Sequence, residues 1–209
     1  MPKYIFNRVQ TELKAFLRFI INLPIINKNM KIIAIVGMPG AGKSEVAGVF
    51  ERKGYVRIRF GDITDVEVAR RNLTLNEISE RIVREQLRQE HGMAAYAVLN
   101  SPAIEKATEK SSVVIDGLYS WEEYLYLKSK FSENFRVLAV WSSPKTRYLR
   151  LTGRKHRPLT NEEANARDKA EIENINKGGP IAMADFTITN ESSMDDLIKQ
   201  TDQIIQKIE

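Results

Sequence analysis

The sequence has no cysteine, no internal repeat and no long uncharged apolar run. The lack of cysteine excludes disulfide bonds, thiolate catalysis and cysteine-based zinc sites, and it is compatible with a reducing compartment. Of the 209 residues, 43% are hydrophobic and 28% are charged, as is usual for a globular protein. This length accommodates one α/β domain with a sizeable core. We therefore expect a cytoplasmic protein.

The basic excess of the chain is concentrated near its start. The formal net charge is +5, and residues 1–30 contain five basic side chains but one acidic side chain, Glu12. The remaining sequence is close to neutral and does not interleave aromatic with basic residues. Nucleic-acid binding by the main domain is therefore not expected.

Residues 5–23 have the pattern of a basic amphipathic helix that Pro24 would end. Charges interrupt the apolar positions too often for a membrane-spanning helix, and no cleavage site for a leader follows. Three interpretations remain open. The segment could lie on a membrane surface, or it could dock on its own domain or a second subunit. It could also be an extension that the core does not need, since Met30 directly precedes the first expected strand.

Residues 37–44, Gly-Met-Pro-Gly-Ala-Gly-Lys-Ser, fit the pattern G-x-x-x-x-G-K-[ST]. In this loop the glycines let backbone N–H groups surround an anion, the lysine contacts the β- and γ-phosphates, and the hydroxyl contacts Mg²⁺. Residues 31–36 predict a buried strand before the loop, and residues 45–52 predict a helix after it. The pattern predicts a site for MgATP whose loop contacts are Gly37, Pro39, Gly40, Ala41, Gly42, Lys43 and Ser44.

Acidic residues follow two further expected strands, at 55–60 and 112–117. Ligands of open α/β sheets bind beside the carboxyl ends of strands. Asp116 is therefore predicted to support Mg²⁺ together with Ser44. Asp62 is predicted to orient the acceptor, although Asp62 or Asp65 could instead cap the next helix.

Residues 66–110 have helical patterns throughout, and this segment is longer than the single helix that usually connects two parallel strands. Residues 74–77 resemble a capping box that would open a long helix through Glu90, and Gly92 would end it. Two short helices, about 93–99 and 102–109, are expected to follow. We interpret this insert, about 62–110, as a flap over the acceptor. Its arginines are assigned to a solvated face except for Arg84.

A second group of arginines follows the fourth expected strand, 137–141, and the helix start at Ser143-Pro144. The spacing i, i+3, i+7 predicts that Arg147, Arg150 and Arg154 share one helical face. A lid over the phosphates is expected at about 150–162, from which Arg150 and Arg154 close over the nucleotide. Arg167 is a further partner on the next helix, which a capping box at 160–163 should open. His156 is interpreted as incidental. A fifth strand at 185–190 and an amphipathic helix at 193–208 complete the domain.

From residue 31 to residue 208 the sequence resembles the nucleotide-kinase branch of P-loop proteins. Residues 150–154, Arg-Leu-Thr-Gly-Arg, are similar to the segment that enters the lid of adenylate kinases, where its arginines contact ATP, and Gly61-Asp62 is similar to the same family. Residues 184–193 resemble the last strand and helix of dephospho-CoA kinases and of archaeal adenylate-kinase-related proteins. Glu90-His91-Gly92 and residues 38–41 also resemble the archaeal group. The resemblance implies a five-stranded parallel sheet of order 2-3-1-4-5, and it places Asn190 near the adenine.

The sequence departs from adenylate kinases at both arginines that hold the AMP phosphate. Asp65 occupies the first position, and residues 116–120, Asp-Gly-Leu-Tyr-Ser, contain no arginine. Dephospho-CoA kinases carry acids here and phosphorylate a ribose hydroxyl, which an acid such as Asp62 would suit. We therefore expect an ATP-dependent kinase of a nucleotide-like hydroxyl acceptor, with Lys43, Asp62, Arg150 and Arg154 as catalytic residues.

Three alternatives stay open at this point. One is a nucleoside monophosphate kinase of the adenylate type. Another is an ATP-binding regulatory protein that docks on a membrane or partner through residues 1–23 and signals by its nucleotide state. The third and weakest is a nucleic-acid kinase. The acceptor and the oligomeric state do not follow from the sequence.

Overall fold

A computed structural model of the chain describes residues 30–155 and 158–209. The expected amphipathic segment at 5–23, with its membrane or protein contact, and His156 lie outside the described residues. No helix within the described ranges is long and apolar enough to cross a membrane.

Five parallel strands form one sheet in the order β2-β3-β1-β4-β5, as the resemblance to P-loop kinases implies. The strands are β1 (Ile32–Val36), β2 (Val56–Arg59), β3 (Val113–Asp116), β4 (Phe135–Trp141) and β5 (Phe186–Thr189). β1 and β3 in the centre are buried at every position, whereas β2 and β5 form partly exposed edges. Near-continuous apolar runs are typical of parallel strands covered on both faces.

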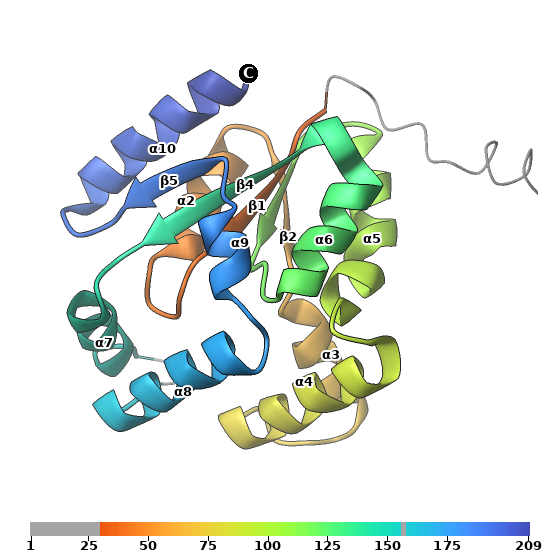
Figure 1. Cartoon of the computed structure of the whole chain (residues 1–209), viewed down its shortest axis with the longest axis vertical. Coiled ribbons are helices and arrows are strands. Elements are labelled where there is room, and N and C mark those ends of the chain that lie inside the picture. Colours follow the sequence, from red (N-terminus) through yellow and green to blue (C-terminus); the bar gives the residue numbers. More distant parts are fainter. Residues whose placement is uncertain (1–29, 156–157) are drawn as a thin grey trace, which may run out of the picture.

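Helices cover both faces of this sheet (Figure 1). On one face, α2 (Lys43–Arg52) and α10 (Met194–Ile208) pack over Ile33, Ile35 and Val114. On the other face, α5 (Ala95–Thr108) and α6 (Trp121–Phe131) bury Tyr96, Ile104 and Leu127.

At the carboxyl end of the strands, two helical groups stand opposite one another (Figure 1). One group comprises α3 (Asp62–Arg70) and α4 (Glu77–His91), which follow β2. The other comprises α7 (Pro144–Thr152) and α8 (Asn161–Glu173), which follow β4. The short η1 (Ser132–Asn134) precedes β4, and α9 (Gly178–Ala182) leads into β5. The phosphate loop therefore lies between a helical flap and a helical lid.

Two details of the flap differ from the sequence prediction. The N-cap of α4 is Asn76, whose side chain accepts a hydrogen bond from Ser79 N at 2.9 Å, so the capping box expected at 74–77 is wrong. The helix begins at Glu77, and this leaves the Glu77 carboxylate free to contact other elements.

The second difference is that residues 95–108 form one helix, where two short helices were expected. Pro102 lies inside α5 and lacks the N–H that an uninterrupted helix would use. The two residues before the proline add side-chain hydrogen bonds to the preceding turn: Asn100 Nδ2 donates to Tyr96 O at 2.9 Å and Ser101 Oγ donates to Ala97 O at 2.8 Å. Burial of Ile104 in the core beyond the proline holds the helix together.

Candidate nucleotide-binding site

The phosphate loop has the backbone that its glycines predict. Gly40 has φ of +80°, and a Cβ there would lie 2.8 Å from Arg147 O. Gly42 has φ of +100°, and a Cβ there would collide with the Asn190 side chain. Both positions therefore need glycine for conformation and for space. Gly42 is the N-cap of α2, so the first turn of that helix opens toward the loop.

Lys43 is folded back onto the loop. Its Nζ donates to Gly37 O at 2.9 Å and to Met38 O at 3.1 Å. Burial and the nearby Lys177 ammonium lower the pKa of Lys43 from 10.5 to about 7. A phosphate beside Lys43 would favour the charged form of this lysine, so the environment of its ammonium suits an anion.

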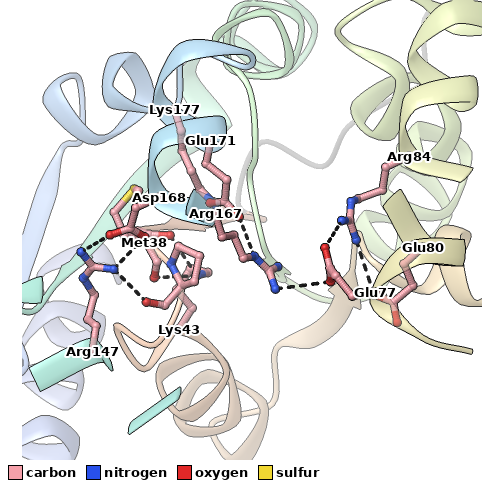
Figure 2. Close-up of polar contacts among 12 residues, drawn as sticks. Met38, Lys43, Glu77, Glu80, Arg84, Arg147, Arg167, Asp168, Glu171 and Lys177 are labelled. Atoms are coloured by element: carbon pink, nitrogen blue, oxygen red, sulfur yellow. Dashed lines mark hydrogen bonds and ion pairs between the residues drawn. The ribbon is translucent and has the colours of Figure 1, made fainter. Parts of the chain in front are cut away.

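A second lysine and an arginine approach the same point from the lid side (Figure 2). Lys177 Nζ lies 2.5 Å from Glu171 Oε2, and Arg167 Nε lies 3.2 Å from Glu171 Oε1. Burial alone would raise the pKa of Glu171, but Lys177 and Arg167 lower it to about 2. Lys43, Lys177 and Arg167 thus surround one carboxylate, which leaves an excess of positive charge suited to phosphates.

Arg147 and Arg150 reach Ser142 from the same side of α7, as their spacing predicts, whereas Arg154 lies beyond the end of that helix at Thr152. Arg147 is nevertheless engaged by an acid. Its guanidinium is buried and bonds to the Asp168 carboxylate at 2.9 and 2.6 Å. Arg147 Nη1 also donates to Pro39 O at 3.1 Å. The arginine therefore ties α7 to α8 and to the phosphate loop.

Arg150 and Arg154 lie on the lid side, in different environments. Arg150 donates to Ser142 Oγ at 3.1 Å and to Asn190 O at 3.1 Å. Asn190 is buried, and its Nδ2 donates to Ala41 O at 2.9 Å, which joins β5 to the phosphate loop. Arg154 is exposed, and desolvation with the neighbouring Arg167 lowers its pKa.

Asp116 is buried at the tip of β3, where Arg57 Nη2 lies 2.5 Å from its Oδ2. Asp116 is the register partner of Ile35 on the neighbouring strand β1, which leads into the phosphate loop, and its charge opposes the lowering of the pKa of Lys43. Within the described residues no cluster of three or more His, Cys, Asp or Glu could hold a metal by itself. Mg²⁺ in phosphate sites uses one or two protein ligands plus phosphates and water. One hydroxyl, Ser44, and one carboxylate, Asp116, fit that requirement.

On the flap side, Asp62 and Asp65 share one arginine. Arg59 Nη1 lies 2.8 Å from Asp62 Oδ1 and 3.0 Å from Asp65 Oδ2. The N-cap of α3 is Gly61, so neither acid caps the helix, and both lie in its first turn. Tyr119 lies beside this turn, since a Cβ on Gly61 would be 3.2 Å from its hydroxyl oxygen.

An ion-pair chain joins the flap to the lid (Figure 2). Glu77 at the start of α4 lies 2.6 Å from Arg84 Nη2 and 3.8 Å from Arg167 Nη1 on α8. Arg84 also lies 3.4 Å from Glu80. The arginine that sequence reasoning singled out on the flap is therefore held by acids of its own helix.

Sequence reasoning missed four charged residues of this site: Arg57, Arg59, Glu171 and Lys177. The two arginines alternate with Val56 and Ile58 along an edge strand, where basic residues are ordinary. Lys177 and Glu171 are six residues apart across a helix end, a spacing that predicts no contact. The closest sequence signal was the run Lys-Gly-Gly-Pro at 177–180, which indicates a turn but not its direction.

Comparison with known proteins places this chain in a family. A family model described as an AAA domain matches residues 33–174. A UPF0200 protein of Thermococcus gammatolerans is 36% identical over 181 residues, which cover 85% of this chain and 95% of that protein. The chain belongs to the UPF0200 family. A second member, from Thermococcus kodakarensis, is 38% identical over 188 residues and is covered in full, with 85% of this chain.

Solved structures share the fold of this UPF0200 protein at low identity. TT1252 from Thermus thermophilus matches with a TM-score of 0.63 and 18% identity, covering 86% of this chain and 98% of that one. A gluconokinase from Sinorhizobium meliloti matches at 0.55 and 14%, with 85% and 93% covered. A shikimate kinase from Acinetobacter baumannii in complex with shikimate matches at 0.53 and 17%, with 86% and 95% covered. The fold is therefore that of P-loop kinases.

Proposed function

We propose that this UPF0200 protein is an ATP-dependent kinase that transfers the γ-phosphate of MgATP to a small acceptor. The observation that carries the proposal is the convergence of three cationic side chains, Lys43, Lys177 and Arg167, at a glycine-rich phosphate loop. A dense positive site between two helical groups suits phosphoryl transfer, because catalysis of this reaction rests mainly on positioning and charge stabilisation.

The residues divide into three roles under this proposal. The loop glycines, Lys43 and Ser44 bind the phosphates. Arg150 and Arg154 border the nucleotide from the lid, and Asn190 borders it from the end of β5. A magnesium ion, when bound, neutralises phosphate charge, and Ser44 and Asp116 are the residues that would hold it. Asp62 orients the acceptor hydroxyl and accepts its proton, while Arg59 fixes the carboxylate of Asp62.

The acceptor we favour carries both a hydroxyl and a phosphate, as dephospho-CoA does. Asp62 supplies a proton acceptor. Arg59, at the end of β2, supplies a cation beside it whose side chain is 44% exposed and able to contact an anionic part of the molecule. In a nucleoside monophosphate the accepting group is itself the phosphate, which would have to stand beside Asp62 in place of the reacting hydroxyl and would be repelled by both Asp62 and Asp65. The fold also accommodates kinases named for shikimate and gluconate, so it does not require a nucleotide acceptor.

A panel assay tests the proposal. Purified protein, MgATP and single acceptors are combined, and phosphorylated product is measured for dephospho-CoA, AMP, CMP, UMP, several nucleosides and no acceptor. We expect product from dephospho-CoA or a nucleoside, and none from the Lys43→Ala variant. Product from AMP alone would contradict the hydroxyl assignment. Nucleotide binding without product from any acceptor would contradict kinase activity and favour the regulatory alternative.

A further inference from the structure

Lys177 is almost completely buried in the segment between α8 and α9. Its side chain is 1% exposed, its Nζ lies 2.5 Å from Glu171 Oε2, and the same nitrogen lies 5.2 Å from the centre of the Tyr119 ring. The desolvation of two charges offsets most of the attraction in a buried ion pair. Fold stability alone therefore does not account for a lysine at this position.

The backbone around Lys177 is fixed in place. Trp121 N donates to Ile175 O at 3.3 Å, and a Cβ on Gly179 would lie 2.6 Å from the Trp121 ring. Asn176 has φ of +51°, a conformation that costs free energy for a residue with a side chain. The segment is thus held against α6, and its strained residue immediately precedes the buried lysine.

Lys177 lies between the two halves of the proposed reaction. On one side its charge lowers the pKa of Lys43 in the phosphate loop. On the other side its ammonium faces Tyr119, whose hydroxyl borders Gly61 next to the acceptor acid Asp62. Lys177 therefore has Lys43 of the phosphate loop near it on one side (Figure 2), and on the other side the Tyr119 ring, whose hydroxyl contacts the turn before Asp62.

We propose that Lys177 is a further catalytic residue, whose ammonium contacts the phosphoryl group in transit from ATP to the acceptor. This assignment rests on the proposed function. The acceptor oxygen forms a bond to the γ-phosphorus as the bond from that phosphorus to the β,γ-bridging oxygen breaks. The electron pair leaves with ADP, and the hydroxyl proton passes to Asp62. Lys177 donates hydrogen bonds throughout and keeps its protons, while Glu171 stays paired with Arg167.

The first test uses ADP with Mg²⁺ and fluoroaluminate, a planar anion that imitates the transferring phosphoryl group and needs no known acceptor. Affinities for ADP alone and for ADP with fluoroaluminate are measured by calorimetry. In Lys177→Met we expect ADP affinity to stay within about threefold and fluoroaluminate-dependent affinity to fall at least about 100-fold. Lys169→Met, which removes an exposed lysine of α8, is the matched control and should change neither. Equal affinities in Lys177→Met and wild type would overturn the assignment.

A second variant separates contact with phosphate from simple neutralisation of Glu171. If Lys177 only neutralises Glu171, the double variant Lys177→Met/Glu171→Gln removes the need for it and regains the fluoroaluminate affinity of Glu171→Gln. If Lys177 contacts the phosphoryl group, the double variant folds but stays impaired. Thermal denaturation shows whether Lys177→Met folds. If this single variant does not fold, the fluoroaluminate affinity of the double variant alone distinguishes contact with the phosphoryl group from neutralisation of Glu171.

Failure of this inference is distinguishable from failure of the proposed function. A wild-type protein that binds fluoroaluminate with ADP in a Lys177-dependent way but phosphorylates no acceptor would refute the kinase and retain Lys177 as a phosphoryl contact. A wild-type kinase whose kcat is unchanged by Lys177→Met would refute Lys177 alone. A wild-type protein that binds ADP equally well with and without fluoroaluminate would refute the phosphoryl contact itself.

Discussion

Arg147 and Asp168 form a buried ion pair with two parallel hydrogen bonds, Nη1 to Oδ1 at 2.9 Å and Nη2 to Oδ2 at 2.6 Å. The same guanidinium donates to Pro39 O in the phosphate loop and to Ser142 O after β4. One side chain therefore connects the loop, α7 and α8. Because the N–H groups of Arg147 already donate to these protein acceptors, few remain to bind a nucleotide.

The first prediction concerns this pair. Replacing Asp168 with Ala leaves the Arg147 charge buried without its partner, so the free energy of unfolding should fall by about 3–5 kcal/mol. Urea denaturation measures the change. Arg81→Ala, which removes the exposed pair between Arg81 and Glu85, is the control and should change stability by less than about 0.5 kcal/mol. A loss as small as in the control would show that the buried pair does not support the fold.

The strands and the phosphate loop could be predicted because their signals are local. Apolar β-branched runs identify buried strands, and the positive φ angles of the loop by themselves favour glycine at Gly40 and Gly42. The order of the strands followed from resemblance to a family rather than from the pattern itself. Capping at Ser143 and at Thr160 was also predictable, since each cap depends on residues within one helical turn.

The partners of charged side chains could not be predicted, because they depend on tertiary contacts. Helical spacing placed Arg147 beside Arg150, but the acid on α8 that binds Arg147 is 21 residues away. Lys177 was missed for the same reason. The capping box of α6, from Ser120 to Glu123, was a local signal that sequence reasoning left unused.

The second prediction is that Lys43 contributes to nucleotide binding and little to stability. Its Nζ donates to two loop carbonyls but lies close to the cations Lys177 and Arg167, so removal of its charge relieves repulsion. In Lys43→Met the free energy of unfolding should stay within about 1 kcal/mol of wild type, while ATP affinity should fall at least about tenfold. Urea denaturation and calorimetry measure the two quantities. Unchanged ATP affinity would contradict the assignment of the loop.

The third prediction concerns pH and the buried Glu123. Burial raises the pKa of this carboxyl from 4.5 to about 7, although Tyr119 N and Ser120 N donate to its Oε2. The folded protein therefore holds a proton that the unfolded chain releases as the pH rises above 4.5. Stability from this group is lost between about pH 4.5 and pH 7 and stays constant above that range.

Glu123→Gln should remove this pH dependence, since an amide can still accept the capping hydrogen bonds but does not ionise. At pH 8 the variant should be more stable than wild type by about 1–3 kcal/mol, and at pH 4.5 the difference should vanish. Urea denaturation at several pH values measures the difference. A constant difference across this range would show that Glu123 does not titrate as its environment requires. Glu122→Gln, at the adjacent position, is a control for the loss of one carboxylate.

The fourth prediction separates the roles of Asp62 and Arg59 at the acceptor site. Asp62 lies in the first turn of α3 and Arg59 holds its carboxylate at 2.8 Å, while Asp65 shares the same guanidinium. If Asp62 accepts the hydroxyl proton, Asp62→Asn should lower kcat about 10²–10⁴-fold with little change in the KM for ATP. Asp65→Asn is the matched control, because it removes an equal charge from the same arginine and should lower kcat less than about tenfold.

Arg59→Met should chiefly raise the KM for the acceptor, since it removes the cation proposed to contact an anionic group. Steady-state kinetics with the acceptor identified in the panel measure all three variants. Equal losses in Asp62→Asn and Asp65→Asn would mean that the two carboxylates act only by fixing Arg59, and the proton acceptor would have to be sought elsewhere in the site.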